Sequence, residues 1–372
     1  MVLCCLGQLT FAALSAAQTP PREHWRASCF VYRDANHNGR YDMGDRPFAG
    51  LAIEMIRPDG TTTQQRSNLG GFTNFSISLD NKEEYDVFEP GVHTINVVPL
   101  EGLYTHAEVN HQRLRFVEAP LAGGGLVPEE TCHHIGIAPL LDISGRVDGL
   151  PAEATIHAEN NNQEIKQGSI APDGSFLVDA KTGDWTVTIR SKEGEELLRR
   201  EVTVAGHPVV LSRMRIPVDT SPAPLTGDIQ TLDFDTLTTS DTLFEMPEGY
   251  GGLGFRNWIS THHKFYNGYG YVNATISGEY IIYNSSGYPA FIWDDEPFDF
   301  VGSYVGLAWP RGEEQPVQIK VWRGEALVHQ ERLTLSVNSP VYYDADFHQI
   351  TKIEIGHGNY ERVVLDDFSI RR

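Results

Sequence analysis

Apolar and polar residues alternate with a period of two along many short stretches of the chain. Clear examples are AIEMI at 52–56, TVTIR at 186–190 and QIKVW at 318–322. Because successive side chains of a strand point to opposite faces, this period predicts strands with one buried face. Turn sequences such as Pro-Asp-Gly at 58–60 separate the strands, and long amphipathic helices are missing. The pattern therefore predicts an all-β protein built from antiparallel β-sandwiches.

Composition divides these predicted strands into successive modules. At roughly 150 residues per domain, a chain of 372 residues has room for two or three domains. Residues 24–138 form the first predicted module, 140–216 a shorter second one, and 227–372 the third. Residues 217–226 contain the sequence VDTSPAP, which predicts a short, stiff, solvated linker. We therefore expect three β-sandwich modules in tandem.

The N-terminal residues 1–17 are apolar and carry no charged side chain. They end in Ser15-Ala16-Ala17, a small-residue pattern that signal peptidases accept. The usual Lys or Arg before the apolar stretch is missing, and a buried N-terminal strand is the alternative interpretation. We predict a signal peptide and a secreted, extracellular protein. No other stretch approaches eighteen consecutive apolar residues, so no membrane span is expected.

Removal of residues 1–17 would leave two cysteines, Cys29 and Cys132. In an oxidising compartment, two cysteines that flank a domain-sized stretch predict one disulfide bond. Closing a loop of about a hundred residues would stabilise the fold by at most about 4–5 kcal/mol. Two free, buried thiols are the alternative.

The charge balance limits the classes of partner. Asp and Glu number 50 against 29 Lys and Arg, which gives a net charge of −21. A surface this acidic repels the phosphates of nucleic acids and of anionic lipids, so we expect no nucleic-acid partner. It is compatible with divalent cations, although a diffuse negative charge also serves solubility alone.

The sharpest local motif is DANHNGRYDMGD at residues 34–45. Oxygen-bearing side chains stand at loop positions 1, 3, 5, 9 and 12, glycine stands at 6, and position 7 offers a backbone carbonyl. This spacing wraps oxygens around a hard cation, so we predict a Ca²⁺ site, with a hydrated turn as the alternative. Aspartate at position 12 and asparagine at 3 and 5 lower the charge, which predicts moderate affinity. The predicted ligands are Asp34, Asn36, Asn38, the carbonyl of Arg40, Asp42 and Asp45.

These residues carry a resemblance to a known family. Val31-Tyr32-Arg33-Asp34 and the loop after it, with FAGLAI at 48–53 and GFTNF at 71–75, resemble the calcium-binding B-type domains of serine–aspartate-repeat adhesins. Further along, ISGRV at 143–147 and GDWTV at 183–187 are similar to carboxypeptidase regulatory-like domains. The first resemblance implies a prealbumin-like sandwich stiffened by structural calcium. The second implies another prealbumin- or immunoglobulin-like sandwich that acts as a spacer.

The third module resembles another group of exported proteins. MPEGYGGLGFRNW at 246–258, with FDF at 298–300 and LDDF at 365–368, is similar to jelly-roll modules of exported bacterial proteins, including many with PEP-CTERM sorting signals. The resemblance implies a jelly roll that binds a carbohydrate or an extracellular matrix component.

Two sets of residues in the third module are candidates for binding. This module holds four of the six tryptophans, and aromatic rings stack on sugars, although most aromatic residues of a sandwich pack in its core. The carbohydrate-binding candidates are Tyr250, Trp258, Tyr266, Tyr269 and Trp293. First and last strands of sandwiches commonly pair, which would gather carboxylates into a possible second cation site or leave them at a solvated sheet edge. These carboxylates belong to Asp233, Asp235, Asp366 and Asp367.

Motifs of known catalytic sites are missing, so we predict a protein that is not an enzyme. The adjacent histidine pairs 133–134 and 262–263 cannot easily bind one metal ion, because strand neighbours point to opposite faces, so we expect them to be surface histidines. The prediction is a secreted, non-catalytic, calcium-stabilised protein that binds a carbohydrate or matrix component. One alternative is a purely structural surface or matrix protein. The other is a cryptic carbohydrate-active enzyme, for which Asp294-Asp295-Glu296 would offer an acid and a base.

Overall fold

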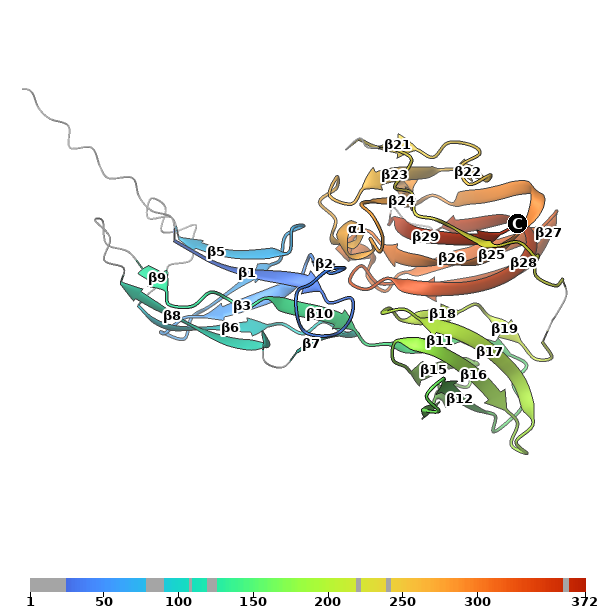
Figure 1. The fold of residues 1–372 in the computed structure, drawn as a ribbon, viewed down its shortest axis with the longest axis horizontal. Helices are drawn as coiled ribbons and strands as arrows, with labels where there is room; N and C mark the ends of the chain where they lie inside the picture. The colour runs from blue at the N-terminus through green and yellow to red at the C-terminus, as the bar shows by residue number, and fades with distance from the viewer. Residues whose placement is uncertain are drawn as a thin grey trace, which may run out of the picture.

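The computed structural model describes residues 25–77, 90–106, 109–118, 126–218, 222–238, 242–356 and 361–372. The predicted signal peptide lies outside these residues. The regular structure of the described residues consists of strands, one short α-helix, α1 (Tyr269–Asn273), and short 3₁₀ helices (Figure 1). This confirms the all-β prediction. In the described part of the chain, no helix is long and apolar enough to cross a membrane.

The first sandwich consists of two five-stranded sheets. One has the order β2-β1-β10-β7 with β5 also on β1, and the other has the order β4-β3-β6-β8-β9. The alternation of apolar and polar residues decides which side of each strand faces the core. In β3, Ile53 and Met55 are fully buried, while Glu54 between them is not. The disulfide predicted between Cys29 and Cys132 is present. The strands are β1 (Trp25–Arg33), β2 (Arg46–Pro47), β3 (Ala52–Ile56), β4 (Thr62–Arg66), β5 (Phe72–Ile77), β6 (Gly91–Val97), β7 (Leu103–Thr105), β8 (His111–Glu118), β9 (Leu126–Pro128) and β10 (Ile135–Pro139).

The second sandwich packs the sheet β13-β12-β16-β17 against the sheet β14-β15-β11-β18. Trp185, Val187 and Ile189 alternate along β16 and fill the core between the two sheets. The strands are β11 (Asp142–Asp148), β12 (Thr155–Asn160), β13 (Ile165–Gln167), β14 (Ser169–Ile170), β15 (Ser175–Asp179), β16 (Gly183–Arg190), β17 (Glu196–Val204), β18 (Val209–Leu211) and β19 (Met214–Arg215).

The third sandwich is built around two long strands, β25 and β28, which pair with each other. Its first and last strands also pair as predicted, with Leu232 of β20 opposite Phe368 of β29. The strands are β20 (Ile229–Leu232), β21 (Phe244–Glu245), β22 (Gly254–Arg256), β23 (Trp258–His262), β24 (Tyr280–Asn284), β25 (Ala290–Leu307), β26 (Pro316–Arg323), β27 (Ala326–Thr334), β28 (Val341–Gly356) and β29 (Val363–Arg371).

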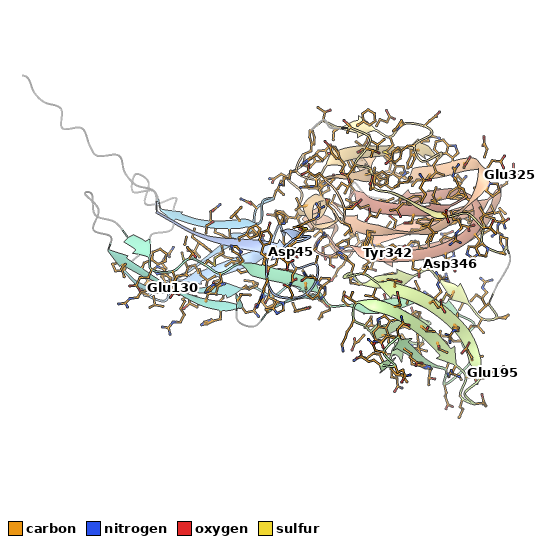
Figure 2. All side chains as sticks on the ribbon, in the orientation of Figure 1. Asp45, Glu130, Glu195, Glu325, Tyr342 and Asp346 are labelled. Carbon is orange, nitrogen blue, oxygen red and sulfur yellow. A yellow bond between two sulfur atoms is a disulfide. The ribbon has the colours of Figure 1, made fainter. Side chains whose placement is uncertain are left out.

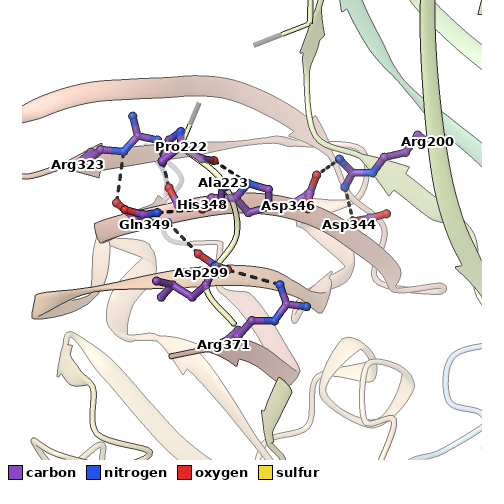
Figure 3. Close-up of polar contacts among 11 residues, drawn as sticks. Arg200, Pro222, Ala223, Asp299, Arg323, Asp344, Asp346, His348, Gln349 and Arg371 are labelled. Carbon is purple, nitrogen blue, oxygen red and sulfur yellow. Dashed lines mark hydrogen bonds and ion pairs between the residues drawn. The ribbon is translucent and has the colours of Figure 1, made fainter. Parts of the chain in front are cut away.

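The second and third sandwiches share a sheet. The short strand β18 pairs in parallel with β28, so one sheet of fifteen strands runs through both sandwiches. Arg200 of β17 strengthens this contact, because its guanidinium bridges Asp344 and Asp346 of β28 (Figure 3). The sequence predicted two separate modules in tandem and gave no sign of this shared sheet.

The described part of the predicted linker is attached to the third sandwich. The carbonyl of Ala223 accepts a hydrogen bond from Gln349 Nε2 at 2.9 Å, and the amide of Leu225 donates to Asp299 Oδ2 at 2.8 Å (Figure 3). Asp299 is buried and also accepts from the amide of Gln349. These bonds tie residues 223–225 to β25 and β28, while Ala223 and Pro224 are exposed, as expected for a solvated linker.

Candidate calcium loop and module junction

The loop of residues 34–45 connects β1 to β2 and is organised around the carboxylate of Asp34. Asp34 is completely buried, and its two carboxylate oxygens accept hydrogen bonds from the amides of Asn38 at 3.1 Å and Gly39 at 2.7 Å. Gly39 has a φ of +75°, in the left-handed region that favours glycine. A side chain there would also meet the ring of His106, about 2.9 Å from the position of a Cβ. The glycine at position 6 therefore has the steric role that the motif requires.

The other predicted side-chain ligands form hydrogen bonds within the loop. The carboxylate of Asp42 accepts from the side-chain amides of Asn36 at 3.0 Å and Asn38 at 2.7 Å. The carboxylate of Asp45 accepts from the backbone amides of Ala35 and Asp42, both at 2.9 Å. The loop thus brings the predicted side chains together around its own amides. Arg40, whose carbonyl is the sixth predicted ligand, has an exposed side chain.

The carboxylates of the loop lie close enough together to shift the pKa values of nearby groups. Burial, followed by the charges of Asp34, Asp45 and Asp42, raises the pKa of Tyr32 to about 12. The pKa of Asp45 is raised by burial and, to a smaller extent, by Asp34 and Asp42, although two backbone amides oppose this. Three carboxylates, two amide side chains and a carbonyl are a donor set that suits Ca²⁺. In the described residues, no three His, Cys, Asp or Glu side chains have the geometry of a metal site.

The residue before this loop joins the first sandwich to the third. Arg33 is buried, and its guanidinium donates to the carbonyls of Asn273 at 2.9 Å and Thr275 at 2.7 Å. The side chain of Asn273 returns two bonds, accepting from the amide of Ala49 and donating to its carbonyl, each at 3.0 Å. Burial lowers the pKa of Arg33 only to about 10, so its charge persists at neutral pH.

The second sandwich also approaches the calcium loop and the third sandwich near Arg33. A Cβ at Gly206 would lie 3.0 Å from the carbonyl oxygen of Ala35, inside the loop. His207 beside it is buried with its ring centroid 5.2 Å from that of Tyr304 in the third sandwich. Burial, and then the charge of Arg33, holds the pKa of His207 well below its usual value. We call this meeting place the module junction, formed by Arg33, Ala35, Ala49, Gly206, His207, Asn273 and Tyr304.

Sequence reasoning missed the module junction. Asn273 appears in the sequence only as part of an Asn-Ala-Thr sequon, and Arg33 only as the end of a strand. The two residues lie 240 positions apart, so no local pattern connects them. Figure 2 shows Asp45 of the calcium loop near the place where the first sandwich approaches the third.

The five carbohydrate-binding candidates already have partners inside the chain. Trp258 is completely buried, and Tyr250 packs between Phe234 and Phe255 at ring distances of 6.0 and 6.3 Å. Tyr266 stacks on the guanidinium of Arg362, 4.5 Å from its ring centroid.

The remaining two candidates cover glycines. A Cβ at Gly50 of the first sandwich would lie 2.5 Å from the ring of Tyr269, so this ring belongs to the contact between the first and third sandwiches. A Cβ at Gly254 would lie 2.4 Å from the ring of Trp293. The sequence shows that these residues are aromatic, but it does not show which surfaces their rings cover. Their role in carbohydrate binding stays a prediction.

Three of the four aspartates of the predicted second cation site accept hydrogen bonds from residues 276–280, and the fourth, Asp233, accepts from the amide of Asp235. Asp366 is completely buried and accepts from the amides of Ile276 and Ser277, while Asp235 accepts from the amide of Glu279 at 2.6 Å. Burial, followed by the charges of Asp233 and Asp235, raises the pKa of Asp367, although a hydrogen bond from Ser277 opposes this rise. The chain's own amides and a hydroxyl therefore neutralise part of this charge, and a cation there stays a prediction.

Two further predictions concern titratable residues. Asp294 forms an ion pair with Arg372, while Asp295 and Glu296 are exposed, so the acid and base of an enzyme stay a prediction. His133 and His134 are exposed as expected. The surface prediction is wrong for His263, which directly follows β23 and is buried, with its amide bonded to the carbonyl of Glu279 at 3.0 Å, whereas His262 is half-buried.

Neither a protein-family model nor a curated protein matches this chain. Among solved structures, it is similar to the Bacillus anthracis TIE protein at 9% identity and a TM-score of 0.23, over 52% of this chain and 34% of that one. It thus spans about a third of that relative. The minor pilin GBS52 of Streptococcus agalactiae has 8% identity and a TM-score of 0.21, over 54% of this chain and 99% of that one.

A third similar structure holds the M60 catalytic domain with the CBM51-1 and CBM51-2 domains of Clostridium perfringens ZmpB. It has 14% identity and a TM-score of 0.23, over 60% of this chain and 32% of that one. Because these TM-scores are low, the function proposed below rests on the residues of this chain alone.

Proposed function

We propose that the protein is a secreted, non-catalytic structural and adhesive protein whose three sandwiches are held as one unit by a calcium-binding loop. Its partner would be a carbohydrate or a component of an extracellular matrix. The observation that carries the proposal is the position of Arg33. This residue directly precedes Asp34, the first predicted ligand of the loop, and its guanidinium is bonded to the third sandwich.

Adjacency in the chain couples the loop to the module junction. A cation bound by Asp34 would hold the end of β1 and therefore the backbone of Arg33. The loop carbonyl of Ala35 also lies close to Gly206 of the second sandwich, since a Cβ there would be 3.0 Å from its oxygen. Calcium that binds only the folded loop stabilises the folded state by mass action, by about 2.7 kcal/mol at one hundred times its Kd. We therefore expect calcium to stiffen the junction as well as the loop.

Calorimetry and small-angle scattering of the full chain test this proposal. We expect calcium to bind at the loop with a Kd of about 10⁻⁴ to 10⁻³ M, the range of extracellular modules. Calcium should raise the Tm, and EDTA should increase the radius of gyration. Asp34→Ala should abolish binding, and the exposed, nearly isosteric Asp42→Asn should weaken it without unfolding the loop.

The matched control is Asp295→Asn, which removes an exposed carboxylate of the third sandwich and should leave calcium binding unchanged. Unchanged binding in both Asp34→Ala and Asp42→Asn would exclude the loop as the site. Calcium binding without any change in Tm or radius of gyration would leave a metal site but contradict its structural role.

A further inference from the structure

A cavity of about 680 Å³ opens beside the calcium loop of the first sandwich. Residues 39–41 of the loop form one wall, and residues 131–134 form another. The Cys29–Cys132 disulfide attaches this second wall to β1, and the buried Tyr32 also lines the cavity. Ligand sites of proteins have volumes of about 300–1,000 Å³, so the cavity is large enough for a small sugar.

An aromatic ring is held in a fixed position at this cavity. Tyr41 is 48% exposed, although its ring contacts three others. The ring centroids of Phe30, Tyr32 and His134 lie 4.9, 5.2 and 5.9 Å away, at interplanar angles of 80°, 64° and 84°. Rigid tyrosine rings give contact area at little cost in conformational entropy. Tyr41 thus offers a sugar ring a surface that needs little reorganisation.

The charged side chain in the lining of the cavity is an arginine, in a protein that is acidic as a whole. Among the described residues, the lining includes Arg40, His133 and His134 and no Asp or Glu, although the net charge of the protein is −21. The guanidinium of Arg40 has no ion-pair partner in the described part of the chain. The nearby carboxylates of Asp34 and Asp42 accept from donors inside the loop. An anion would therefore find the guanidinium of Arg40 and two imidazoles at the cavity, while calcium bound in the loop would offset the charges of Asp34, Asp42 and Asp45 beside it.

We propose that this cavity binds a sugar that carries a carboxylate, with its ring on Tyr41 and its carboxylate near Arg40 and the two histidines. This inference rests on the proposed adhesive function and specifies its ligand class and location. It places the site in the first sandwich, away from the aromatic candidates of the third. Because Tyr41 and Arg40 belong to the calcium loop, calcium should order the binding surface and strengthen binding.

Calorimetry of the full chain with saturating calcium tests the inference. The probes are a glucuronic-acid disaccharide, its neutral methyl ester, sialyllactose and lactose. We expect saturable binding of at least one acidic sugar, with the neutral counterpart about tenfold weaker or more, since it lacks the charge-assisted hydrogen bonds. The uronate and sialate pairs show which carboxylated sugar fits. EDTA should weaken binding of that sugar.

Variants locate the site. Tyr41→Leu keeps an apolar side chain but removes the ring, and Arg40→Ala keeps the backbone carbonyl but removes the charge. Each should weaken binding of the acidic sugar about tenfold or more, whereas Arg40→Lys should restore part of it. Tyr288→Leu and Arg332→Ala, which alter an exposed tyrosine and an exposed arginine of the third sandwich, should leave binding unchanged.

The same titrations contain the outcomes that overturn the inference. Absence of binding by either acidic sugar would do so, as would equal binding of acidic and neutral sugars or unchanged binding in both loop variants. An acidic tripeptide, titrated as a fifth probe, overturns the inference in favour of a peptide ligand if it binds as tightly as the acidic sugar. Calcium titrations of the Arg40→Ala variant separate the two proposals, because this variant should keep the calcium site.

Discussion

At the scale of single residues, Asn273 connects two sandwiches through one buried amide. Its side chain satisfies both backbone groups of Ala49 and also donates to the carbonyl of Val337 at 3.2 Å. Replacement by alanine would leave these groups unpaired, at a cost of about 1–3 kcal/mol for each buried group. We expect Asn273→Ala to lower the free energy of unfolding by several times the effect of Asn267→Ala, an exposed control. Chemical denaturation measures both, and equal effects would contradict this role of Asn273.

A second residue, His263, makes stability depend on pH. Burial, followed by the nearby positive charges, lowers its pKa to about 3, whereas an unfolded chain has the usual value of 6.5. Between these values the unfolded state binds more protons, so this residue removes stability as the pH falls from 6.5 toward 3 and has no effect above that range.

The His263→Gln variant isolates this contribution. Relative to the variant, the wild type should lose up to about 1.4 kcal/mol of unfolding free energy for each pH unit across the window. Urea denaturation at a series of pH values measures the difference. Parallel curves for the two proteins would show that His263 is not the residue responsible.

At the scale of elements, prediction succeeded where the chemistry is local. The burial of β3 follows from its period-two sequence, and the bonds of Asp34 to the amides of Asn38 and Gly39 follow from Asp and Gly at fixed spacings, while calcium at this loop stays a prediction. The short strand β18 has three apolar residues, too few to reveal a period or a partner. Its parallel pairing with β28 depends on the packing of two sandwiches, and the same holds for the contact between Arg33 and Asn273.

The disulfide that joins β1 to the segment before β10 makes another element-scale prediction. It closes a loop with a sequence separation of 103, for which the chain-entropy estimate gives at most about 4–5 kcal/mol. We expect replacement of both Cys29 and Cys132 by serine to lower the free energy of unfolding by a large part of this amount. Urea denaturation of variant and wild type measures the loss. A change below about 1 kcal/mol would mean that the closed loop is already restricted in the unfolded chain.

At the scale of the whole molecule, the shared sheet should make the second and third sandwiches unfold together. The Arg200 ion pair with Asp344 is largely buried, with side-chain exposures of 17% and 14%, and removal of one partner of such a pair costs about 3–5 kcal/mol. Burial raises the pKa of Asp344 despite the opposing charge of Arg200, so loss of the arginine would leave this carboxyl without its counter-charge.

Calorimetry of the full chain can reveal this coupling. In the wild type, we expect one cooperative transition for the second and third sandwiches. Arg200→Met should lower the melting temperature of the second sandwich and separate the transitions, while Arg199→Met, the exposed neighbour, should leave them together. Hydrogen exchange would assign each transition, because amides of β16 and β28 should have equal opening free energies in the wild type and different ones in Arg200→Met. Two transitions already present in the wild type would mean that the short strand β18 positions the sandwiches without coupling their stability.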